Sequence, residues 1–199
     1  MVRNMRIWIS IILVEALLVA FGQMGLKSVS RKLQTENSMD RTRIALIKDD
    51  IKCFPIPVAY RGEVHYEDSY GAARIQGGHE GCDIMDVRNV PGRIPVVSVC
   101  DGELTNIGWL YLGGYRIGIT SDNGIYYYYA HLDSYAAGMT QGRRVLAGEL
   151  IGFMGDTGEG EEGTSGKFPV HLHFGIYVKG TDGREESVNS YPFLIEANR

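Results

Sequence analysis

PVHLHF, residues 169–174, alternates apolar and imidazole side chains. Successive side chains of a β-strand point to opposite faces, so this alternation predicts a strand with one buried face. The apolar residues at the even positions would bury that face, while His171 and His173 project together from the other. Placing two imidazoles side by side is energetically unfavourable unless one of them binds a metal or both take part in the same function. The alternative is an ordinary pair of surface histidines without a function. The stretch therefore predicts a strand that carries a site.

The rest of the chain from residue 54 onward supports a β-rich domain. Short apolar runs are broken by Gly, Asn and Asp, as in the turn Asp122-Asn123-Gly124. Turn signals at regular spacing are typical of antiparallel hairpins, so we expect an all-β fold, a mainly antiparallel sheet or sandwich. The predicted strands are Pro95–Cys100, Gly114–Thr120, Ile125–Ala130, Val145–Ile151 and His171–Val178.

A second histidine lies in HEGCD, residues 79–83. Glycines within and just before this stretch make a helix unfavourable, so we expect a strand. On a strand His79 and Asp83 share a face, and Gly81 between the two side chains leaves room. Cys82 would point to the opposite face and is not expected to be a ligand. Imidazole and carboxylate are both ordinary zinc ligands.

A third histidine, His131, closes the run YYYYAH at residues 126–131. Strand alternation places Tyr127 and Tyr129 on the same face as His131. Alone, such a histidine is more often a satisfied structural residue than a catalytic one. Its interest comes from the two other histidine-bearing stretches.

The histidines and the aspartate match the needs of a hydrolytic zinc site. A catalytic zinc takes three protein ligands and keeps one position for water. His79, Asp83 and either His171 or His173 would supply the three ligands. The remaining histidine of that pair and His131 could then move protons, as amide hydrolysis requires.

Composition bounds the class of protein. The chain has 199 residues, enough for one full-sized domain, and a formal net charge of −4 without a basic block, so no nucleic-acid partner is expected. Three cysteines, at 53, 82 and 100, match neither a zinc ribbon nor a dense disulfide scaffold.

Prolines at 55 and 57 mark a change of composition along the chain. We expect the domain to cover residues 53–199 and a polar stalk or juxtamembrane helix to cover residues 27–52.

The first 26 residues predict export. Arg3 and Arg6 precede an apolar stretch from Ile7 to Leu26, which as a helix would span about 30 Å. Glu15 makes it a marginal span. An uncleaved signal anchor would leave the domain outside the cell membrane on a single span, a cleaved signal peptide would release it, and the third alternative is a buried helix of a soluble protein.

Four stretches, in order, carry a resemblance to the lysostaphin-like zinc metallopeptidases, which cleave peptides of peptidoglycan. They are HEGCDI, PVVSVCDG, YYAHLD, and VLAGELIGFMGDTG leading to HLHF. The resemblance implies a mainly antiparallel β-sheet domain with Zn²⁺ in a groove. It implies that His79, Asp83 and His173 bind the zinc, and that His131 and His171 take part in catalysis.

Two questions stay open beside that resemblance. The Gly/Glu-rich segment 155–166 is longer than in typical members of the family, and it would either gate the groove at its rim or be a flexible insertion. The function implied is a zinc-dependent endopeptidase acting on stem or cross-link peptides of peptidoglycan. The alternatives are a non-catalytic envelope scaffold or activator, in division or sporulation, and a zinc amidase of cell-wall material.

Overall fold

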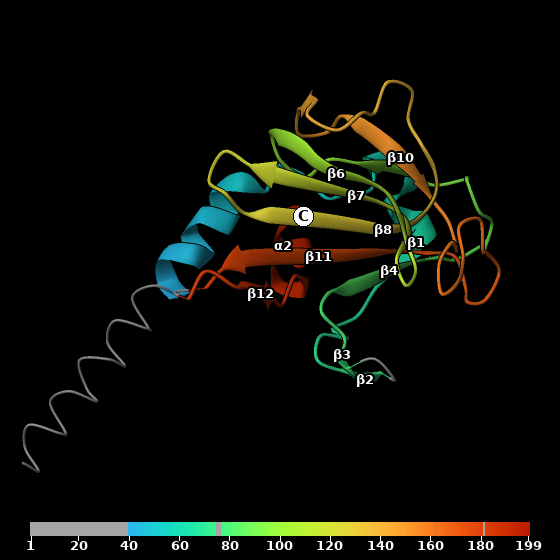
Figure 1. The fold of residues 1–199 in the computed structure, drawn as a ribbon, viewed down its shortest axis with the longest axis horizontal. Coiled ribbons are helices and arrows are strands. Elements are labelled where there is room, and N and C mark those ends of the chain that lie inside the picture. The colour runs from blue at the N-terminus through green and yellow to red at the C-terminus, as the bar shows by residue number, and fades with distance from the viewer. Residues whose placement is uncertain (1–39, 75–76, 181) are drawn as a thin grey trace, which may run out of the picture. The chain divides into compact units, whose positions relative to one another are not determined.

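The computed structural model describes residues 40–74, 77–180 and 182–199. The chain divides into two compact units, residues 1–45 and 46–199, and the second unit carries the fold (Figure 1). The predicted signal anchor or signal peptide at residues 1–26, and residues 27–39 of the predicted stalk, lie outside the described residues. Within the described part of the chain, no helix has both the length and the apolar character needed to cross a membrane.

The second unit is built on one antiparallel sheet. Ten of the strands in the described residues join this sheet, whose central path runs β1-β4-β11-β8-β7-β6-β9. Strand β10 pairs with β5 and β8, β12 pairs with β11, and β2 and β3 form a separate hairpin. The elements are η1 (Val58–Glu63), β1 (Val64–His65), β2 (Ala73–Arg74), β3 (Gly77–Gly78), β4 (Cys82–Asp86), β5 (Pro95–Val97), β6 (Gly102–Leu110), β7 (Gly114–Ser121), β8 (Tyr126–Tyr135), β9 (Arg144–Val145), β10 (Leu150–Met154), β11 (His171–Lys179), β12 (Glu185–Val188) and α2 (Tyr191–Ala197).

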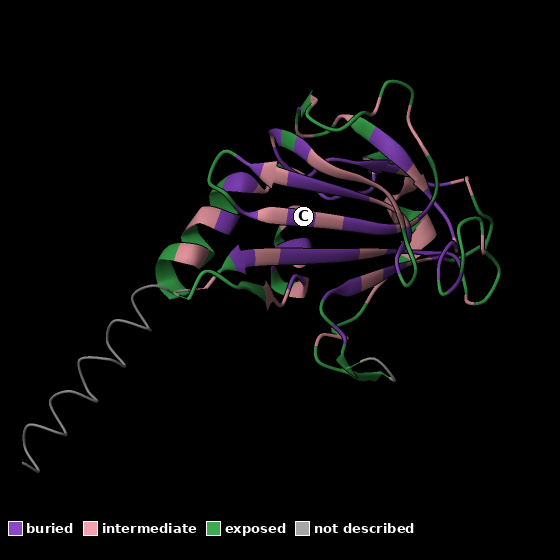
Figure 2. Cartoon of the chain, in the orientation of Figure 1, coloured by how far each residue is buried: buried purple, intermediate pink, exposed green. Residues whose placement is uncertain are grey.

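The prediction of a mainly antiparallel β fold is therefore confirmed. Buried residues are concentrated along β7, β8 and β11 in the middle of the sheet (Figure 2). In β11 the apolar residues Leu172 and Phe174 are fully buried, as the alternation predicted. Leu172 and Phe174 pack in a core that also contains Tyr127 and Tyr129 of β8.

One predicted strand is divided in the structure, and one strand was not predicted at all. The segment predicted as one strand, Val145–Ile151, divides into β9 and β10, because the chain turns between them at Gly148, where φ is +80°. The long strand β6, Gly102–Leu110, was missed, because its partly exposed residues do not alternate regularly between apolar and polar.

The compact unit begins at Leu46, before Cys53, where the change of composition had indicated the boundary. Residues 46–50 are helical, and Ile47 is fully buried in the core. Asp50 is buried as well, and its carboxylate accepts hydrogen bonds from three side chains of the β7–β8 hairpin region. The donors and their distances are Ser121 Oγ at 2.5 Å, Asn123 Nδ2 at 2.8 Å and Tyr127 Oη at 3.1 Å. These bonds attach residues 46–50 to the sheet.

We expect Asp50→Ala to lower the free energy of unfolding by about 2 kcal/mol, because it leaves buried donors without an acceptor. The matched control is Asp49→Ala, since Asp49 is exposed next to Asp50, and it should change the free energy by less than about 0.5 kcal/mol. Urea unfolding followed by circular dichroism measures both. Equal stability of the two variants would show that the Asp50 network does not hold this segment.

Candidate metal centre

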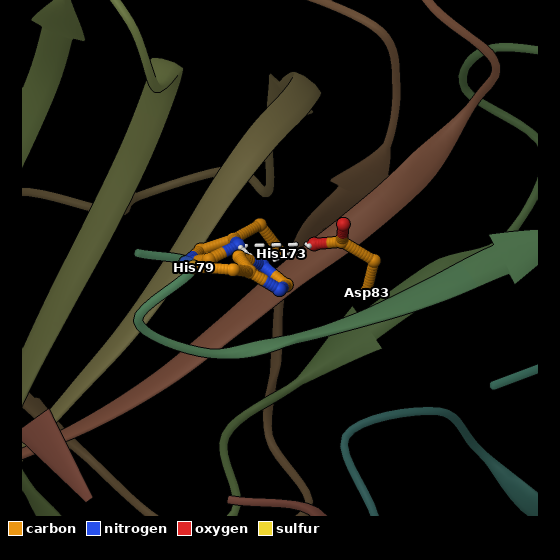
Figure 3. Close-up of side chains that lie close together, drawn as sticks. All are labelled: His79, Asp83 and His173. Atoms are coloured by element: carbon orange, nitrogen blue, oxygen red, sulfur yellow. Dashed lines mark hydrogen bonds and ion pairs between the residues drawn. The ribbon is translucent and has the colours of Figure 1, made fainter. Parts of the chain in front are cut away.

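The candidate site lies where three neighbouring strands, β4, β11 and β8, run side by side. The register of β11 pairs His173 with Asp83 of β4 on one side and with Ala130 of β8 on the other. His79, Asp83 and His173 point toward one another (Figure 3). His79 Nε2 lies 3.1 Å and His173 Nδ1 lies 3.0 Å from Asp83 Oδ1, and the two ring nitrogens are 2.9 Å apart. Three potential ligand atoms thus converge on one point.

The loop before β4 carries His79. The prediction of a strand over residues 79–83 was wrong for its first half, because β4 begins at Cys82. Instead, His79 is held to the turn before the β2–β3 hairpin by a backbone hydrogen bond to Ala72. Gly81 provides the room expected of it, since a Cβ there would lie 2.7 Å from His173 Cε1. Cys82 is fully buried in the core and does not join the cluster.

Hydrogen bonds to the backbone orient the cluster. The Nδ1 of His79 donates to the carbonyl of Ser69 at 3.0 Å, which leaves Nε2 with a free lone pair facing Asp83 and His173. Burial opposes ionisation of Asp83, but the imidazoles of His173 and His79 next to its Oδ1 outweigh burial and hold the pKa of the carboxyl well below its usual range. Two imidazoles and an ionised carboxylate are a donor set that suits zinc. The three ligand atoms lie within 4.8 Å of one another.

A β-bulge positions His131. Strand β7 pairs Tyr115 with Leu132 and Ile117 with Tyr129, so two residues of β8, Ala130 and His131, oppose one residue of β7. His131 has a φ of +60°, which is rare for a residue with a side chain. The bulge changes the alternation of β8, so that Ala130 and His131 both line the pocket beside the cluster while Leu132 is buried.

The bulge overturns one prediction. Tyr127 and Tyr129 were expected to share the face of His131, but both are fully buried in the core. Tyr128 faces the site instead, with its ring centroid 5.9 Å from that of His173. Burial raises the pKa of Tyr128 to about 12, so its hydroxyl stays a hydrogen-bond donor at neutral pH. Tyr128 was not predicted to face the site, because the expected alternation of β8 ran unbroken through residue 131.

Backbone carbonyls also set the protons of His131 and His171. The Nδ1 of His131 donates to Thr157 O at 2.8 Å, and the Nδ1 of His171 donates to Pro169 O at 2.7 Å. Each ring therefore keeps Nε2 as a proton acceptor. The two ring centroids are 4.6 Å apart. Burial lowers the pKa of His131 to about 3 and lowers that of His171, so both rings are neutral at pH 7.

Thr157 is a further residue of the site that was not predicted from the sequence. Its Oγ1 donates to Leu132 O at 2.7 Å and accepts from the backbone N–H of Tyr115 at 3.1 Å. These two bonds fix the Thr157 carbonyl against His131. Thr157 also lies close to Gly114, where a Cβ would come within 2.3 Å of the Thr157 carbonyl oxygen. The local sequence Asp156-Thr157-Gly158 gave no sign of this contact, because the contact depends on the fold.

A pocket of about 330 Å³ opens over the cluster. The segment 155–166 reaches its rim, as expected, because Glu159 lines the pocket. Backbone hydrogen bonds from Glu159 and Gly160 to Leu112 and Tyr111 attach the segment to the β6–β7 turn. The residues that line the pocket are Arg74, Gly77, Gly78, His79, Glu80, Leu112, Gly113, Tyr128, Ala130, His131, Glu159 and His173.

Comparison with known proteins gives the family. The model of peptidase family M23 matches residues 77–185, more than half of the chain. A curated relative, the L-Ala–D-Glu endopeptidase of Bacillus subtilis (strain 168), is 42% identical over 144 residues, which cover 71% of this chain and 42% of the relative. Lysostaphin of Staphylococcus simulans is 32% identical over 141 residues, covering 67% of this chain and 26% of lysostaphin. The chain thus spans less than half the length of these curated relatives.

Solved structures show the same fold. A crystal structure from Ruminococcus gnavus ATCC 29149, named as the glycyl-glycine endopeptidase lytM, is 54% identical to this chain in sequence and has a TM-score of 0.69. The match covers 75% of this chain and 61% of the crystallised chain. The catalytic domain of lysostaphin from Staphylococcus simulans is 26% identical with a TM-score of 0.54, covering 70% of this chain and 98% of that domain.

The cluster geometry predicts how zinc binding responds to substitution. His79→Ala should weaken zinc binding by more than roughly 100-fold, because the loss of even an orienting partner of a zinc ligand costs about 10-fold to 100-fold. His131→Ala should still bind one equivalent, since His131 lies outside the converging trio. His65→Ala, at an exposed position in β1, is the control. Competition titration against a zinc dye measures all three, and zinc loss in His131→Ala alone would contradict this assignment.

Proposed function

Because the chain belongs to peptidase family M23, we propose that residues 46–199 form a zinc-dependent endopeptidase that cleaves peptides of peptidoglycan. The observation that carries this proposal is the spatial grouping of the five residues: His79, Asp83 and His173 converge, and His131 and His171 lie next to them. A scaffold of the same fold would not need to keep all of them.

We assign His79, Asp83 and His173 to zinc. The donor set fits this metal, and the carbonyl of Ser69 holds the ring of His79 in the tautomer that a ligand needs. When bound, zinc would supply Lewis acidity that polarises a substrate carbonyl and favours water as a nucleophile at neutral pH.

We assign proton transfer and charge stabilisation to His131 and His171. Each ring has its Nδ1 proton engaged by a backbone carbonyl, so its Nε2 can accept a proton. The Nε2 of His171 is buried without a hydrogen-bond partner among the described residues and lies 3.8 Å from Asp83 Oδ1, so its lone pair is free to accept a proton next to the metal ligands. A ring that has taken a proton can donate it to a leaving amine, as amide hydrolysis requires. Tyr128 adds a neutral hydroxyl donor to the pocket that His131 lines.

The substrate and location are supported by the relatives. Their names give two kinds of bond, L-Ala–D-Glu and glycyl–glycine, and both types of peptide occur in cell walls. We infer that the domain acts outside the cytoplasm, either attached to the cell membrane or secreted. A membrane partner for residues 1–26 stays a prediction from the sequence.

Digestion of purified cell-wall sacculi tests the function. The zinc-loaded protein should release peptides with new amino termini, identified by mass spectrometry. Treatment with a chelator should abolish release, and one equivalent of zinc should restore it. Fragments without new peptide amino termini would indicate an amidase, and activity that is unaffected by zinc removal would contradict the proposal.

His131→Ala should lower kcat by at least about 100-fold while zinc stays bound, because general acid–base groups contribute about 10²-fold to 10⁴-fold. His65→Ala is again the control. Full activity of His131→Ala would remove His131 from the mechanism, and a non-catalytic scaffold would show no turnover even in the parent protein.

Thr157→Val should lower kcat by about 10-fold and leave KM and zinc content unchanged, because the variant loses both hydrogen bonds that fix the carbonyl against His131. The matched control is Thr164→Val in the same segment, because its hydroxyl donates to Glu161 O and, within the described part of the chain, to no atom near His131. Equal kcat values for the two variants would show that this support does not matter.

A further inference from the structure

Arg74 stands at the edge of the pocket on a hairpin that is tied to the metal centre. The register of β2 and β3 pairs Arg74 with Gly77 and Ala73 with Gly78, and both glycines line the pocket. The same segment binds His79, whose backbone bonds Ala72 and Gly71. In Figure 1 the β2–β3 hairpin lies below β4, on the side of β4 away from β11. The position of Arg74 is thus coupled to that of the cluster.

The charge of Arg74 is distinctive within the pocket. Among the described residues that line the pocket, Arg74 is the single Lys or Arg, whereas Glu80 and Glu159 are acidic. Its Nη2 lies 2.5 Å from Asp83 Oδ2, and its side chain is 42% exposed. A guanidinium presents five N–H donors in a planar fork, and this ion pair uses one edge of it. Among the described residues the guanidinium has no other hydrogen-bond partner, so its remaining donors are free to bind a ligand.

Two roles for Arg74 can be distinguished. In the first, Arg74 only orients Asp83, whose other oxygen already faces His79 Nε2 and His173 Nδ1. In the second, Arg74 also binds the substrate. The first role affects every substrate equally, whereas the second favours a substrate that carries a negative charge beside the bond to be cleaved.

We propose that Arg74 is a specificity residue that binds a carboxylate of the substrate peptide next to the scissile bond. This inference rests on the proposed endopeptidase function and narrows its substrate class. A bond between L-Ala and D-Glu fits, because the carbon bonded to the scissile nitrogen carries the free α-carboxylate of D-Glu. A glycyl–glycine bridge has no such group. The acidic stem peptide is therefore the expected substrate, and its amidated form a poor one.

The test compares two substrates that differ in one group. One is a stem tripeptide with a free α-carboxylate on D-Glu, and the other is the same peptide with that group converted to the carboxamide. The parent protein should prefer the acid by roughly 10-fold to 100-fold in kcat/KM, the range expected when a charge-assisted hydrogen bond is lost. Arg74→Gln should bring the ratio close to one, mainly by slowing cleavage of the acid.

Two further variants control the result. Arg74→Lys keeps the charge but not the fork, so it should retain part of the preference. Arg144→Gln removes an arginine from an exposed pair with Asp122, outside the pocket, and should leave the ratio unchanged. Zinc content and thermal unfolding of each variant are measured alongside.

The outcomes separate this inference from the proposed function. Equal losses for both peptides in Arg74→Gln would overturn it and leave Arg74 as a support for Asp83. Cleavage of pentaglycine without cleavage of the acidic peptide would also overturn it while the endopeptidase function stands. If no peptide is cleaved, the proposed function fails, and calorimetric binding of the two tripeptides to the parent and Arg74→Gln decides the inference. A preference for the acid that disappears in Arg74→Gln supports it, and no preference overturns it.

Discussion

Strand β11 lies between β4 and β8, and its register pairs His173 with Asp83 on one side and with Ala130 on the other. The arrangement of the site depends on this pairing, because a shift by one residue would turn His171 and His173 into the core and expose Leu172 and Phe174. The buried face therefore fixes the register, and the register in turn fixes which side chains meet. The register of β11 therefore determines both the packing of the core and the arrangement of the site.

The bulge in β8 adds what regular pairing cannot supply. It brings His131 beside His171 with a φ of +60°, a conformation that the surrounding bonds must hold. Thr157 supplies much of that support, by bonding the ring of His131 and the backbone of Leu132. The segment 155–166 thus has a structural role at its start, in addition to its place at the rim of the pocket. Carbonyl oxygens, which only accept hydrogen bonds, select the tautomers of the histidines.

Much of the fold and the candidate site could be predicted from the sequence, because the signals are local. Alternation in residues 169–174 predicted both the strand and the projection of His171 and His173 to one side. Gly81 and Cys82 lie as predicted, one giving room and one buried. The start of the compact unit could not be predicted, because Asp50 is a polar residue whose burial depends on partners far along the chain, in the β7–β8 hairpin.

By itself, the sequence determined the β class, the five candidate residues and, through motifs in order, a family resemblance that the comparison with family M23 bears out. From the residues alone, the choice between His171 and His173 stayed open; the tertiary structure brings His173 into the trio with His79 and Asp83. It also decided that Tyr128 faces the pocket, that Thr157 holds His131, and that Arg74 reaches Asp83. The reason is physical: alternation and turn residues act between neighbours in the chain, whereas a bulge, a tautomer and a charge in a pocket depend on atoms that only folding brings together.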